Sequence, residues 1–170
     1  SVAVNGSTVE LTLATAIGQG QAVTVGYTAP LASAATSNAA VQDSAGNDAV
    51  TLVAKTAVTN ISTVDKSAPT FTRAATSVDG LKVILTYNEP LHATTAAKTA
   101  FAVKVAGVTA TVSSVAVSGS NIELTLATSI GAGQAVTVGY KAPIVSAATT
   151  NAAVQDAGGN DAPTLSADTA

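Results

Sequence analysis

The oxygen-bearing side chains near the end of the chain are the best candidates for chemistry, because they lie close together in sequence. Asp156, Asn160 and Asp161 fall within six residues in a chain of which only 10% is charged. Calcium takes about six to eight oxygen ligands from carboxylates, amides and backbone carbonyls. Three side chains are too few for such a site, so a calcium ion would need ligands from other parts of the fold.

The same stretch is also typical of a turn that binds nothing. Asp and Asn side chains hydrogen-bond to backbone groups close to them, and glycines such as Gly158 and Gly159 enter left-handed conformations at little cost. Turn chemistry alone therefore explains the loop sequence. From the sequence, a calcium site and a plain turn both stay open.

Catalytic motifs are not indicated elsewhere in the chain. His92 is the single histidine, and no G-x-S-x-G motif is present. The glycine pairs at residues 17–20 and 130–133 lack the continuation of a phosphate-binding loop, so they are interpreted as turns between strands. We predict that the chain is not an enzyme and that His92 is a solvated loop residue.

The composition excludes several further classes. A net charge of −3 and a pI near 4.8 disfavour nucleic-acid binding. No run of about 20 apolar residues occurs, so no membrane span is predicted. Cysteine is absent, which excludes disulfides and thiolate metal sites, and methionine is absent too. We expect an internal or processed piece of a secreted protein, whose secretion signal lies outside this sequence.

An internal repeat dominates the organisation of the chain. Residues 1–57 align without a gap onto residues 114–170, and 114 − 1 gives a period of 113 residues. Repeats this similar are typical of tandem arrays. Residues 58–113 have no counterpart, so we assign residues 1–64 to the C-terminal half of one repeat and residues 65–170 to a nearly complete second repeat.

Apolar residues alternate with polar ones through each copy, as half-buried strands require. The pattern predicts strands near residues 70–76, 81–87, 101–105, 115–126 (a hairpin), 136–140 and 164–170. Asn5-Gly6 and Ser118-Gly119 are predicted to be equivalent hairpin turns. The fold class is therefore all-β, with tandem Ig-like Greek-key β-sandwiches of about seven strands each.

This topology supplies the missing calcium ligands. In an Ig-like sandwich the N-terminal linker, the second-to-third-strand loop and the last loop lie at the same end. Asp65 falls in the linker, Glu89 in the second of these segments and Asp156 in the third. Like charges gathered there would repel one another unless a cation lay between them. The predicted Ca²⁺ ligands are therefore Asp65, Glu89, Asp156, Asn160 and Asp161.

The second copy contains four short motifs in a fixed order: APTF at residues 68–71, VILTYNEPL at 83–91, VTVGYKAP at 136–143 and VQDAGGNDA at 154–162. Together they resemble the SWM-type (swimming-motility surface protein) repeat, a bacterial Ig-like tandem repeat of large secreted surface proteins and adhesins. The resemblance covers essentially the whole chain. It implies a secreted or cell-surface location, a spacer or adhesive role and no catalytic activity.

Two functions follow as expectations. The favoured one is a structural spacer or stalk repeat of a long extracellular fibre, sheath or adhesin, whose partners are neighbouring copies of the repeat in the same chain or in an adjacent subunit. The alternative is an adhesion module that binds a glycan or a surface, although two Phe, three Tyr and no Trp provide few stacking platforms. We also expect residues 1–57 to be completed, either by preceding sequence in a longer chain or by strands of a neighbouring molecule.

Overall fold

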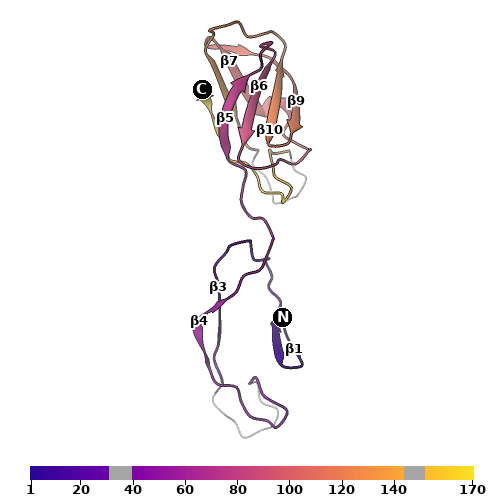
Figure 1. Ribbon diagram of the computed structural model, residues 1–170, viewed down its shortest axis with the longest axis vertical. Helices are drawn as coiled ribbons and strands as arrows, with labels where there is room; N and C mark the ends of the chain where they lie inside the picture. Colours follow the sequence, from indigo (N-terminus) through magenta and orange to yellow (C-terminus); the bar gives the residue numbers. More distant parts are fainter. Residues whose placement is uncertain (31–39, 144–151) are drawn as a thin grey trace. The chain divides into compact units, whose positions relative to one another are not determined.

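The computed structural model describes residues 1–30, 40–143 and 152–170, and the chain divides into two units, Ser1–Asp65 and Lys66–Ala170 (Figure 1). Asp65 thus ends the first unit, whereas it was predicted to begin the second. No helix within the described residues is long and apolar enough to cross a membrane. The strands of the first unit are β1 (Val2–Asn5), β2 (Thr8–Leu11), β3 (Val23–Tyr27) and β4 (Leu52–Val58).

The second unit consists of strands with one short 3-10 turn, η1 (Lys98–Ala100). It has one strand more than the predicted seven, because β8 follows β7 through a tight turn in which Ala106 and Gly107 both have positive φ. The strands are β5 (Phe71–Thr76), β6 (Lys82–Tyr87), β7 (Phe101–Val105), β8 (Val108–Ala110), β9 (Val112–Ser118), β10 (Asn121–Leu126), β11 (Val136–Tyr140) and β12 (Leu165–Thr169).

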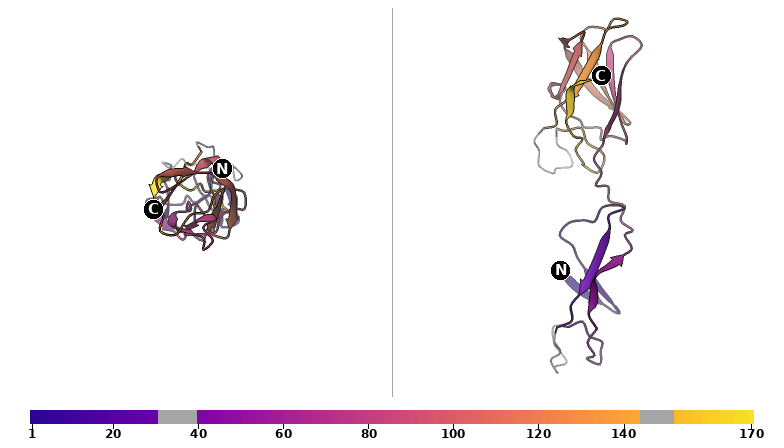
Figure 2. Two further views of the ribbon diagram at one scale, coloured as in Figure 1. Left: turned by 90° about the horizontal axis from the view of Figure 1, so that it is seen from above. Right: turned by 90° about the vertical axis from the view of Figure 1, so that its left-hand side faces the viewer.

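Two four-stranded antiparallel sheets enclose the core of this unit, in the orders β5-β6-β10-β9 and β12-β11-β7-β8 (Figures 1 and 2). Alternate residues of the central strands point inward, as in β6, where Val83 and Leu85 are buried and their neighbours are not. Leu124 on β10 and Val103 on β7 meet them in the same apolar cluster. The all-β prediction with antiparallel sheets is confirmed.

The two copies form the same hairpin. In β1–β2, Val2 lies opposite Leu11. In β9–β10, the equivalent residues Val115 and Leu124 lie opposite each other. The turn residues are Gly6-Ser7 in the first copy, one position later than the predicted Asn5-Gly6. Gly6 has φ +58° and stands at the first central position, the arrangement of a type II′ turn.

The last strands of each copy also correspond. Gly26 on β3 lies against Ala54 of β4 so closely that a Cβ there would come within 2.9 Å of the Ala54 Cα atom. Gly139 on β11 makes the same close approach to Ala167 of β12. A side chain at either position would push the paired strand away, so glycine is required for these pairings.

Candidate metal centre

The loop after β6 carries the first of the candidate ligands. Asn88 fixes this loop to the start of β5, because its Oδ1 accepts a hydrogen bond from the Thr70 backbone N–H at 2.6 Å and its own N–H donates to the Thr70 carbonyl at 3.0 Å. Two residues beyond Glu89, the Leu91 N–H donates to the Gly119 carbonyl at 2.9 Å. Glu89 is thus half-buried in a loop that is fixed on both sides.

Asp156 is a buried carboxylate, with only 2% of its surface exposed. Its Oδ1 accepts a hydrogen bond from the Asn160 backbone N–H at 2.9 Å, and its Oδ2 accepts one from the Asn160 side-chain amide at 2.7 Å. An isolated bridge pairs Asp156 with Leu91, which brings the last loop next to the loop that holds Glu89. The backbone therefore positions Asp156 beside Glu89.

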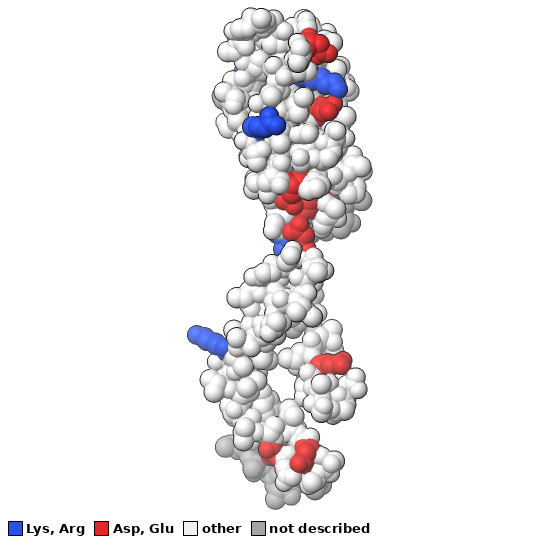
Figure 3. All heavy atoms as spheres, in the orientation of Figure 1, with Lys and Arg blue, Asp and Glu red and all other residues white. Residues whose placement is uncertain are grey.

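Three of the predicted ligands come together. Asp65, Glu89 and Asp156 each offer a carboxylate oxygen, and these oxygens lie within 4.8 Å of one another. Figure 3 shows acidic side chains gathered at one end of the second unit. Oxygens at this spacing are able to bind the same divalent cation.

The other two predicted ligands have different contacts. The Asn160 amide donates to Asp156, so it supports that carboxylate. Asp161 Oδ1 accepts a hydrogen bond from Gln155 Nε2 at 2.7 Å. Gln155 is almost fully buried, at 1% exposure, and was not among the predicted site residues. Its counterpart Gln42 makes the same contact with Asp48, also at 2.7 Å. The presence of glutamine at this position in both copies is the sequence signal that could have identified Gln155.

The same loop forms in the first unit. Asp43 Oδ1 accepts hydrogen bonds from the Ala45 and Asn47 backbone N–H groups, both at 2.9 Å, and Oδ2 accepts one from the Asn47 side chain at 2.8 Å. The Asn47 side-chain hydrogen bond is the main reason that the pKa of Asp43 lies below its ordinary value. Asp43 is exposed, whereas Asp156 is buried. Asp–Asn turn chemistry therefore shapes the loop in both copies, and the group of three carboxylates involves only the second copy's loop.

His92 has a structural role in the same region. Its Nδ1 accepts a hydrogen bond from the Thr94 backbone N–H at 3.1 Å, and its own backbone N–H donates to the Gln155 carbonyl at 2.7 Å. The ring therefore caps its own loop, and the backbone ties that loop to the last one. His92 was predicted to be a solvated loop residue, but it is half-buried and these two contacts explain its position.

Comparison with known proteins gives one family. The SWM repeat, described as "Putative flagellar system-associated repeat", matches residues 1–32 and 64–145, and this description names no catalytic activity. Among curated proteins, none matches the sequence. A solved structure that is similar is the N-terminal part of the bacterial S-layer protein SbsC, at 20% identity and a TM-score of 0.45, covering 58% of this chain. The chain spans 22% of that structure's length.

Proposed function

The chain belongs to the SWM repeat family, and on this basis we propose that it is a structural spacer repeat of a long extracellular fibre, sheath or adhesin at the cell surface. We interpret the second unit as an Ig-like Greek-key sandwich, a fold in which two sheets share one core. The near-identical copies in one chain support an array of such units. In such an array each unit would bear mechanical load.

The observation that carries this proposal is the way in which the chain leaves the first unit. After β4, the Asn60 side-chain amide donates to the carbonyls of Gly18 and Gln21, both at 2.8 Å. Ser62 Oγ donates to the Ile17 carbonyl at 2.6 Å. The start of the linker is therefore attached to a turn of its own repeat. A spacer needs such attachment, because a free linker would bend under thermal motion.

The alternative, a glycan-binding module, is less well supported. Sugar recognition uses exposed aromatic rings as flat platforms, because rings bury area at low entropic cost. None of the five aromatic side chains of this protein is exposed. They are Tyr27 and Phe71, which are half-buried, and Tyr87, Phe101 and Tyr140, which are buried.

A calcium ion at Asp65, Glu89 and Asp156 is the second part of the proposal. It is supported by the spacing of the three carboxylates, because like charges held this close repel one another unless a cation lies between them. Bound calcium would remove this repulsion. The repeat would then be most stable in a calcium-rich extracellular medium.

Thermal unfolding with and without calcium tests this part. A ligand that binds only the native state at 100 times its Kd stabilises by about 2.7 kcal/mol, so the midpoint should rise by roughly 10 °C. Glu89→Gln should abolish the rise. The matched control Glu123→Gln, which removes a carboxylate paired with Lys82 at 2.7 Å instead, should keep it. An unchanged midpoint in the parent protein would refute the calcium site.

Small-angle X-ray scattering of arrays of two, four and six repeats tests the spacer role. The maximum dimension of a stiff array grows in proportion to the number of repeats, whereas that of a freely jointed chain grows with its square root. Proportional growth is expected. Square-root growth would show that the linkers bend freely, and the spacer proposal would fail.

A further inference from the structure

The first unit has two strands with an unused edge. Within its described residues, β2 pairs only with β1, and β3 pairs only with β4. Their counterparts in the second unit, β10 and β11, each lie between two strands. The extra neighbours there are β6, which pairs with β10, and β7, which pairs with β11. The first unit therefore lacks one neighbouring strand in each of its sheets.

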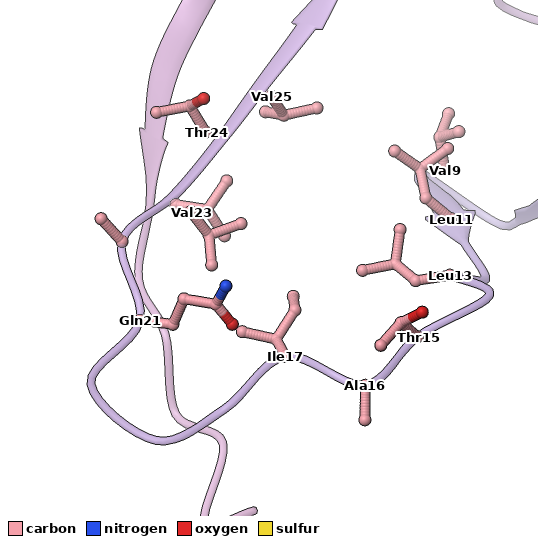
Figure 4. Close-up of a pocket in the computed structure, with 12 residues that line it drawn as sticks. Val9, Leu11, Leu13, Thr15, Ala16, Ile17, Gln21, Val23, Thr24 and Val25 are labelled. Atoms are coloured by element: carbon pink, nitrogen blue, oxygen red, sulfur yellow. The ribbon is translucent and has the colours of Figure 1, made fainter. Parts of the chain in front are cut away.

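The apolar residues of this open face are exposed, although the same residues are buried in the second unit. Val9 is 42% exposed and Leu11 is 51% exposed, whereas their counterparts Ile122 and Leu124 are both at 0%. The two small sheets of the first unit line a hollow of about 600 Å³ (Figure 4). Apolar side chains dominate its lining, among them Val9, Leu11, Leu13, Ile17, Val23 and Val25.

The second unit shows what covers this face in a complete repeat. Seven of the fourteen buried residues of its core cluster come from residues 66–113. We infer that the open face of the first unit is a docking site for residues 66–113 of a second copy of this repeat, which would insert one strand beside β2 and another beside β3. The seven residues that would fill the hollow are Val83, Leu85, Tyr87, Ala96, Phe101, Val103 and Val112.

The register of the docked segment follows from the second unit. Ile122 lies opposite Leu85 and Leu124 opposite Val83, so the incoming β6 places Leu85 opposite Val9 and Val83 opposite Leu11. Val138 lies opposite Val103, so the incoming β7 places Val103 opposite Val25.

Charge complementarity supports the same register. Glu123 on β10 accepts a hydrogen bond from Lys82 on β6 at 2.7 Å. Glu10 is the counterpart of Glu123 and stands on β2, the strand with the free edge. The docked segment brings a lysine to this glutamate, which a partner with unrelated sequence would not do.

A second intact molecule docked face to face does not provide the strands that the first unit lacks. Residues 66–113 of this sequence already pair with β10 and β11 of their own second unit. Two first units in contact would cover apolar surface, but neither would provide the strands that the free edges of β2 and β3 require. The occupant therefore has to be a segment that is not yet paired.

Hydrogen exchange of the 170-residue protein, titrated with a separately produced segment of residues 66–113, tests the inference. At one equivalent we expect the amides of β2 and β3 to exchange about 100-fold more slowly, because they become interior to cooperative sheets. The second unit should be unchanged, since its own segment is covalently attached. In the segment, Val103→Asp should abolish the protection and Thr109→Asp should keep it, because Val103 is buried and Thr109 is exposed in the same hairpin.

A fused form covers the case in which the free segment precipitates. A copy of residues 66–113 placed directly before Ser1 reproduces the junction that joins residues 113 and 114 within β9. The same slowing at β2 and β3 is then expected, and a fused Val103→Asp copy should lose it. No slowing with either form overturns the inference. It is also overturned if the protein alone reaches equal protection by forming a dimer as its concentration rises.

Discussion

Replacing the same leucine in each copy compares the closed face with the open one. Leu124 on β10 and Leu11 on β2 are equivalent residues in hairpins of the same register. Leu124 is fully buried, and Leu11 is 51% exposed beside the hollow. Truncating a buried leucine to alanine costs about 3 kcal/mol, because both apolar contacts and packing volume are lost. Truncating a half-exposed one costs at most about 1 kcal/mol.

Residue-resolved unfolding in urea separates the two units and measures both effects. Leu124→Ala should lower the unfolding free energy of the second unit by about 3 kcal/mol and its thermal midpoint by roughly 12 °C. Leu11→Ala should change the first unit little. With the segment 66–113 docked, Leu11→Ala should become as costly as Leu124→Ala. An equal cost for both variants without that segment would refute the claim that the first unit is open.

Three further predictions concern single side chains. Asn60→Asp replaces an amide donor by a carboxylate that faces two carbonyl oxygens, so hydrogen exchange of the linker after β4 should speed up, whereas exchange in β3 should not change. Gly139→Ala places a methyl group against the Ala167 backbone, so the second unit should lose about 1–3 kcal/mol in urea unfolding. The pKa of Asp79 lies below its ordinary value of 3.8, mainly because Ser77 Oγ donates a hydrogen bond to its carboxylate. Its contribution to the stability of the folded state is therefore present above pH 3.8 and is lost as the pH falls through the folded pKa. Acid titration should therefore destabilise Asp79→Asn less than the parent.

The sequence predicted the β-architecture because the alternation of apolar residues is regular and each copy supports the other. Val83 and Leu85 alternate with polar or half-buried neighbours, and β6 formed where expected. The strand β8 was missed, since it has only three residues and follows Ala106-Gly107, a pair without the usual turn signature. The hairpin turn was placed one residue early because Asn5-Gly6 is itself a strong turn pair, although Gly6 takes the first central position.

The candidate site was predictable in its location but not in its detailed contacts. Loop positions in the expected sandwich were enough to place Glu89 and Asp156 at one end. The hydrogen bond between Gln155 and Asp161 depends on how one side chain lies inside a short loop, which spacing does not determine. The assignment of Asp161 as a calcium ligand stays a prediction, and its contact with the Gln155 amide was not foreseen. Whether calcium binds stays a prediction.

Pulling a single array of identical repeats from its two ends tests the mechanical role most directly. A period of 113 residues, extended at about 3.4 Å per residue, releases roughly 350 Å when one sandwich unfolds, after the folded length is subtracted. A load-bearing spacer predicts abrupt events separated by this one length, as many as there are complete repeats. Smooth extension without separate events, or steps of unequal length, would contradict the proposal that each repeat is an independent mechanical unit.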